Sequence, residues 1–198
     1  MATGDKQRLI TSIVAEVLNE EARTDITFDW FINKHDKEYF GKHFTTIDKI
    51  FSSLGGDKQA NQTKRTTKLK CDAYFGGQNN FIFEFDEYQH FSSARLKTLE
   101  FYPTELELYF DIDKWKKYCN IYKDKADKYR KNKTASGFEF EGGRTAQRAY
   151  LDCFRDLLPE INGLRPTVRI SEFEVASIFE NNKEAYNKVE KLLKSKIR

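Results

Sequence analysis

Apolar side chains recur every three or four positions in several parts of the chain, and this spacing predicts amphipathic helices. The clearest cases are Gln7–Glu21 and Thr145–Leu158, where the apolar residues fall on one helical face. A similar pattern predicts a C-terminal helix within residues 180–198. Shorter helices are expected at Ala94–Phe101, at Lys114–Arg130 and, once or twice, within the aromatic-rich segment 25–51.

Alternation of apolar and polar positions predicts strands elsewhere. Lys68–Tyr74 and Phe81–Asp86 are joined by Phe-Gly-Gly-Gln-Asn-Asn, a connection rich in residues that tolerate positive φ, so they should form a hairpin. A further strand is expected at 166–175, a strand or extended link at 104–111, and a polar loop at 57–67. This order of elements predicts a mixed α/β fold in which helices flank a small mixed central sheet.

Composition indicates one ordinary globular unit. The chain has 198 residues, of which 39% are apolar and 33% charged. That length favours a single domain over 1–198, with a core at about 5–175 followed by the C-terminal helix. No apolar run approaches the roughly 20 residues of a membrane span, and the first residues lack the apolar core of a signal peptide, so we expect a cytoplasmic protein with no membrane partner. Three widely spaced cysteines fit neither a disulfide framework nor a zinc site.

Basic residues are distributed unevenly, although the net charge is only +3. The segment from Lys114 to Lys133 holds nine Lys or Arg against two Asp, and a second basic stretch, Lys64–Lys70, leads toward an acidic strand. Basic segments on either side of an acidic centre are typical of a phosphodiester-binding site that uses a metal. For Lys114–Lys133 alone, a solvated helix face is an equally good interpretation.

The acidic strand is the stretch Phe-Ile-Phe-Glu-Phe-Asp-Glu-Tyr-Gln-His-Phe at 81–91. In a strand Glu84 and Asp86 share one face, and two buried carboxylates side by side cost several kcal/mol unless a cation compensates them. Hairpin pairing would bring Asp72 beside Glu84. Three carboxylates that converge at a strand end suit Mg²⁺, for which Mn²⁺ can substitute.

Asp72, followed after a hairpin by an apolar strand with Glu84-Phe85-Asp86, resembles the PD-(D/E)XK nuclease superfamily, which includes most type II restriction endonucleases. The strand is similar to the I-E-x-D-G-x-Q-H-F kind found in nucleases related to the very-short-patch repair endonuclease. This resemblance covers residues 68–99. It implies a restriction-endonuclease-like core of order α-β-β-β-α-β and metal-dependent cleavage of DNA. It also implies Asp72, Glu84 and Asp86 as metal ligands, with Gln89 and His90 near the scissile phosphate.

Several assignments stay open at this point. No lysine stands two positions after Glu84 or Glu87, so the group that would supply the usual positive charge is not identified. Glu87 with Gln89 is an alternative working pair, which a β-bulge near Asp86 would favour. Glu16 or Glu20 is a further candidate ligand. Candidate phosphate contacts are Lys68, Lys70, Arg95, Arg144, Arg148 and the helix entry at 142–145.

The sequence therefore predicts a Mg²⁺-dependent DNA endonuclease, a type II restriction enzyme or its catalytic or nicking subunit. Water would attack the phosphodiester in line, with Gln89 positioning water or phosphate and His90 carrying a proton. Its partner would be double-stranded DNA, with a homodimer or a larger recognition subunit supplying specificity. The alternatives are a noncatalytic nucleic-acid-binding protein with a degenerate nuclease fold, and a repair or mobile-element nickase.

Overall fold

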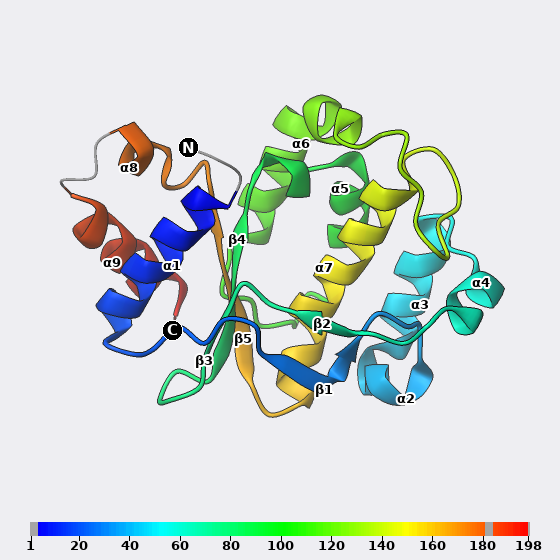
Figure 1. Ribbon diagram of the computed structural model, residues 1–198, viewed down its shortest axis with the longest axis horizontal. Helices are drawn as coiled ribbons and strands as arrows, with labels where there is room; N and C mark the ends of the chain where they lie inside the picture. The colour runs from blue at the N-terminus through cyan, green and yellow to red at the C-terminus, as the bar shows by residue number, and fades with distance from the viewer. Residues whose placement is uncertain (1–3, 181–183, 198) are drawn as a thin grey trace.

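A three-stranded sheet lies between two layers of helices in the computed structural model, which describes residues 4–180 and 184–197 (Figure 1). β3 (Ala73–Phe75) pairs antiparallel with β4 (Phe81–Asp86), and β4 pairs in parallel with β5 (Arg165–Ser171). The order β3-β4-β5 puts the acidic strand in the middle. Every residue of β4 is buried, so each of its carboxylates must be satisfied from within the protein.

The first layer consists of α1 (Asp5–Leu18) and α9 (Ala185–Lys196). Both carry an apolar stripe at helical spacing, and these stripes pack on the sheet face that presents Phe81, Phe83 and Phe85. Figure 1 shows the two helices side by side on the left of the sheet. The phenylalanine face of β4 is thereby closed to solvent.

The second layer lies across the opposite face and is centred on the long helix α7 (Gly143–Ile161) (Figure 1). Its core is rich in aromatic side chains, among them Phe51, Trp115 and Tyr150. The helices that pack around α7 are α2 (Lys37–Phe40), η1 (Gly41–His43), α3 (Phe44–Ser53), α5 (Ser93–Leu99) and α6 (Ile112–Lys128). The remaining elements are α4 (Lys58–Thr63), η2 (Tyr88–His90), α8 (Ala176–Glu180) and a two-stranded sheet of β1 (Thr27–Ile32) and β2 (Lys68–Lys70).

The mixed α/β class, with small sheets flanked by helices, is confirmed. The main sheet follows the order α1-β3-β4-α7-β5, which has one strand fewer than the α-β-β-β-α-β order implied by the nuclease resemblance. A restriction-endonuclease-like core therefore stays a prediction. Within the described residues no helix is both long and apolar enough to cross a bilayer, and Cys71, Cys119 and Cys153 are buried free thiols.

Three local predictions were wrong or incomplete, whereas 104–111 is the link that was one of its two predicted alternatives. The segment 25–51 contains β1 as well as helices, and 57–67 contains α4, which begins where Asp57 accepts a hydrogen bond from Ala60 N at 3.0 Å. The segment 104–111 forms only an isolated bridge, from Tyr109 to Val168. The strand predicted at 166–175 ends at Ser171, because a turn closed by Glu174 follows.

The predicted strand 68–74 is divided between the two sheets. Its first part, β2, pairs with β1, and its second part, β3, pairs with β4. The division falls at Asp72, whose side chain accepts a hydrogen bond from Phe85 N at 2.8 Å. The side chain thus takes the place of a backbone partner. The helix predicted within 180–198 is α9, and residues 181–183 and 198 of that prediction lie outside the described residues.

Candidate active site

The two faces of β4 are divided as the alternation predicts. Its phenylalanines contact α1 and α9, while Glu84 and Asp86 face the layer of α7. The register of β4 against β5 is regular from Phe83 to Asp86, with a shift only between Phe81 and Phe83. No bulge therefore reverses the side chains near Asp86.

Asp72 lies beside Glu84, as predicted from the hairpin. The backbone N of Asp72 donates to Glu84 Oε1 at 3.3 Å, and Phe85 N donates to Asp72 Oδ2 at 2.8 Å. Burial raises the pKa of Asp72, although the Phe85 N–H and the charge of Arg155 oppose the shift. Two carboxyls with little solvent around them therefore sit next to each other at this end of the sheet.

Glu84 forms an ion pair with Arg155 of α7. Arg155 Nε lies 2.9 Å from Glu84 Oε1, but its N–H is not aligned on that oxygen, so the contact is between charges rather than a hydrogen bond. Burial raises the pKa of Glu84 to about 8, because the attraction of Arg155 does not offset the loss of solvent. Glu84 is thus largely protonated at neutral pH.

Asp86 belongs to a different set of contacts. Its Oδ2 accepts from Trp115 Nε1 at 2.8 Å, and its Oδ1 accepts from Arg169 at 2.7 Å. Asp86 is 1% exposed and does not line the cavity described below. Each of its oxygens thus already accepts a hydrogen bond from a buried partner. Among the described residues, no three His, Cys, Asp or Glu side chains are grouped so that they could hold a metal ion.

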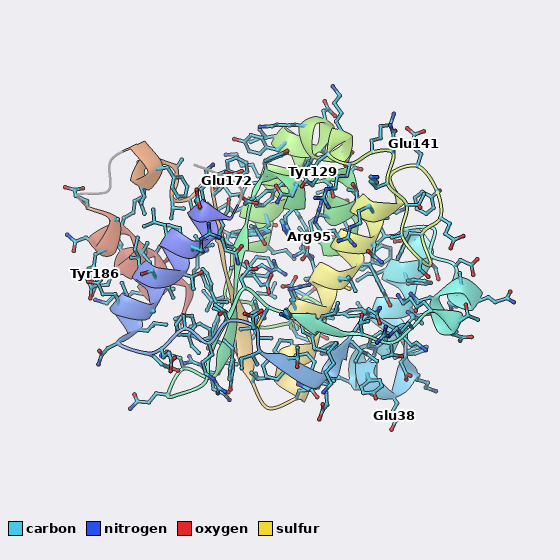
Figure 2. The ribbon with its side chains drawn as sticks, in the orientation of Figure 1. Glu38, Arg95, Tyr129, Glu141, Glu172 and Tyr186 are labelled. Atoms are coloured by element: carbon cyan, nitrogen blue, oxygen red, sulfur yellow. The ribbon has the colours of Figure 1, made fainter. Side chains whose placement is uncertain are left out.

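Arg169 connects Asp86 to a buried ion network beneath the sheet. Its Nε donates to Asp156 Oδ1 at 2.7 Å, and Arg95 donates to the other oxygen of Asp156 at 2.6 Å. Tyr102 OH donates to the same oxygen at 2.6 Å. The network fills the space between α5, α7 and β5, and it balances buried charges that would otherwise be very unfavourable. The label of Arg95 in Figure 2 marks the interior beside α7.

His90 is held by a carboxylate of α7. Its Nδ1 lies 3.0 Å from Asp152 Oδ2 and 3.8 Å from Asp86 Oδ1. Burial disfavours the imidazolium, but the charge and hydrogen bond of Asp152, with the charge of Asp86, outweigh it and raise the pKa of His90. The pKa of Asp152 is depressed in return, since the neighbouring positive charges more than offset its burial.

A cavity of about 280 Å³ opens between the N-terminal end of α1, the end of β4 and α7. It brings together most of the predicted site residues, namely Asp72, Glu84, Glu87, Gln89, His90, Arg144 and Arg148. Gln89 Nε2 donates to Glu87 Oε2 at 2.8 Å, so this alternative pair also reaches the cavity. The cavity thus presents carboxyls at its floor and arginines on its α7 side.

Several predicted contacts lie elsewhere. Arg95 is 1% exposed and bound to Asp156, so its assignment to phosphate was wrong. Lys68 and Lys70 pair with Asp29 and Asp25 at 2.5 Å each, outside the cavity.

Two further predictions also disagree with the structure: the helix entry at 142–145 as a phosphate contact, and Glu16 or Glu20 as an extra ligand. The backbone N–H groups of residues 142–145 donate to carbonyls, including Gly142 N to Lys131 O at 2.7 Å and Arg144 N to Lys133 O at 3.0 Å. They are therefore not free for an anion. Glu20 Oε2 accepts a hydrogen bond from Asn79 Nδ2 at 2.8 Å. Neither Glu16 nor Glu20 lines the cavity.

The residues that sequence reasoning missed come from α1, α7 and β5. Gln7, Asp152 and Arg155 line the cavity, and Arg169 fixes Asp86. A signal was present in α7, where residues 148, 152, 155 and 156 are charged and recur at helical spacing beside the apolar stripe. A charged stripe next to the core is what a helix over a buried acidic strand requires.

Comparison with known proteins gives one partial match. Residues 49–136 match the model of a family of unknown function (DUF7255). No curated protein and no solved structure matches the chain. The matched segment contains Asp72, Glu84, Gln89 and His90, but it excludes α7 and β5, which supply the charged partners of those residues.

Proposed function

We propose that the protein is a Mg²⁺-dependent DNA endonuclease. One observation carries this proposal: two adjacent carboxyls, the half-buried Asp72 and the buried Glu84, open onto a cavity that also holds His90 and arginines of α7. Perturbed titratable groups gathered in a polar cavity favour an active site. The mix of carboxyls and arginines matches a phosphodiester, which needs both a cation site and phosphate contacts.

The donor set fits Mg²⁺ with two protein ligands. Mg²⁺ is commonly held by one or two carboxylates and completed by water and substrate phosphate oxygens. Asp72 and Glu84 would hold it, and the burial that raises the pKa of both groups is a cost that a divalent cation would relieve. When bound, the ion would lower the pKa of water and neutralise charge on the phosphate. Asp86 is left out of the ligand set, because Trp115 and Arg169 use its oxygens.

The other cavity residues would bind the phosphate and move a proton. His90, whose pKa is raised by the neighbouring Asp152, would donate a proton to the leaving oxygen. Arg155 carries a fixed positive charge 2.9 Å from Glu84 Oε1 and would serve in place of the absent lysine. Gln89 cannot act as a base and would orient water or phosphate.

Double-stranded DNA is the proposed substrate. The enzyme would act as a type II restriction endonuclease or as its nicking subunit. One such site cuts one strand. A double-strand break therefore requires a homodimer, a larger recognition subunit or a second binding event on the opposite strand.

A noncatalytic nucleic-acid-binding role is the second candidate, and one observation favours it. Arg155 already occupies the position beside Glu84 that a cation would share. In a degenerate site such a fixed positive charge would replace the metal permanently.

Plasmid cleavage distinguishes the two roles. We expect the protein to nick or linearise supercoiled DNA with Mg²⁺ or Mn²⁺, and Asp72→Asn and Glu84→Gln to lose that activity while they keep the fold. Glu107→Gln, at an exposed position outside the cavity, is the matched control and should cut like the native protein. The nuclease proposal fails if the native protein cuts with neither metal, or if both site variants cut at the native rate.

A further inference from the structure

Three arginines at or near the cavity have no carboxylate partner in the part of the chain that the structure describes. Arg144 and Arg148 line the cavity, and Arg130 follows α6. None of the three forms an ion pair among the described residues. Arg144 donates to the side chain of Gln147, and Arg148 donates to the backbone oxygen of Gln89 at 3.3 Å.

The buried arginines of the same region behave differently. Arg95 and Arg169 each lie within 2.7 Å of a carboxylate oxygen, and Arg155 lies 2.9 Å from one. Structural guanidiniums in this protein are therefore neutralised. Arg144 and Arg148 are half-buried at the cavity without such a pair among the described residues, and there a ligand can supply the missing negative charge.

An aromatic side chain holds two of these arginines in place. The guanidinium carbons of Arg130 and Arg148 each lie 5.3 Å from the centre of the Tyr129 ring. Tyr129 also packs edge-on against Tyr88, whose ring is covered by Lys125. Figure 2 shows Tyr129 at the end of α6, above the N-terminal half of α7. Cation–π contacts of this kind restrict the side chains without neutralising them.

The three charges also affect one another. Burial lowers the pKa of Arg148, and the charges of Arg144 and Arg130 act in the same direction, against the attraction of Asp152. Like charges kept this close are unfavourable in the free protein. An anion placed among them would relieve the repulsion.

We infer that Arg130, Arg144 and Arg148 form a phosphate clamp for the DNA backbone next to the cavity. This inference rests on the proposed function in one respect only, which is that the ligand is DNA. It binds backbone phosphates beside the scissile one and so sets the position of the strand over Asp72 and Glu84. It reads no base, since guanidinium contacts to phosphate carry no sequence information.

The test measures binding without cleavage. Anisotropy of a labelled short DNA duplex, in EDTA and between about 50 and 200 mM NaCl, gives the slope of log affinity against log salt, to which each neutralised phosphate contributes about 0.9. Arg130→Gln/Arg144→Gln/Arg148→Gln should reduce the magnitude of that slope by roughly two to three. Arg130→Gln alone changes one exposed side chain and should reduce it by about 0.9.

The control is Lys188→Gln/Lys191→Gln/Lys194→Gln on α9, which removes the same charge from the other side of the sheet. We expect it to leave the slope unchanged. A native slope in the clamp variants, an equal loss in the control, or no binding of DNA by the native protein would overturn the clamp. Binding that follows the prediction without any metal-dependent cleavage would leave the clamp standing and reject the nuclease.

Discussion

The pKa of Glu84 predicts an unusual dependence of stability on pH. Glu84 has an ordinary pKa of 4.5 and a pKa of about 8 in the folded protein. Between these values the unfolded chain loses a proton that the folded protein keeps. The free energy of unfolding should therefore fall as pH rises from 4.5 to 8, and Glu84→Gln, which cannot ionise, should escape this loss.

The size of the effect follows from the two pKa values. Each pH unit in this window is worth about 1.4 kcal/mol, so the metal-free native protein should lose about 3 kcal/mol relative to the Gln variant between pH 4.5 and pH 7. The difference should level off above pH 8, at roughly 5 kcal/mol. The variant also changes the contact with Arg155, so the change of the difference with pH is the quantity to compare.

Urea unfolding in EDTA, followed by tryptophan fluorescence at several pH values and constant ionic strength, measures this difference. His90 titrates in both proteins, so its contribution cancels. Glu107→Gln, at an exposed position, should follow the native curve. Parallel curves for the native protein and Glu84→Gln would mean that Glu84 ionises at its ordinary pKa, and the account of the buried carboxyl would be refuted.

Two further predictions concern the ion network and the metal. Arg169→Met leaves two buried aspartates without their shared partner. It should lower the free energy of unfolding, measured by urea titration, by about 3–5 kcal/mol. A loss below about 1 kcal/mol would show that the network is not needed for stability. In calorimetry, Mn²⁺ affinity should rise about tenfold per pH unit below pH 8, because binding displaces the Glu84 proton. Glu84→Gln should abolish this dependence and Asp86→Asn should keep it, whereas a native affinity that does not change with pH would contradict the proposed ligand.

Local patterns predicted much of the fold. Alternation placed Glu84 and Asp86 on one face, and the hairpin brought Asp72 beside Glu84, because both depend on strand geometry alone. The partners of these carboxylates were not predictable in the same way. Arg155 and Arg169 lie far along the chain, and only the packing of α7 and β5 on β4 brings them close.

The same limit applies to the roles of individual charged residues. Asp86 is equivalent to Glu84 in the strand pattern, yet Trp115 and Arg169 satisfy it. From the sequence pattern, Arg95 is expected on the exposed face of a short amphipathic helix. In the structure it is buried and paired with Asp156. Whether a charged side chain faces a ligand or a buried counter-charge depends on tertiary contacts, which residue spacing does not encode.

The central claim is that water hydrolyses a DNA phosphodiester at Asp72 and Glu84. Cleavage in water enriched in ¹⁸O, with Mg²⁺ present, tests it most directly, because the attacking oxygen remains in the product. The account predicts one heavy oxygen in the single terminal phosphate that each cut creates, measured by mass spectrometry, an unlabelled hydroxyl on the opposite end, and no product from Asp72→Asn. Unlabelled termini, equal product from Asp72→Asn, or intact DNA with the native protein would contradict it.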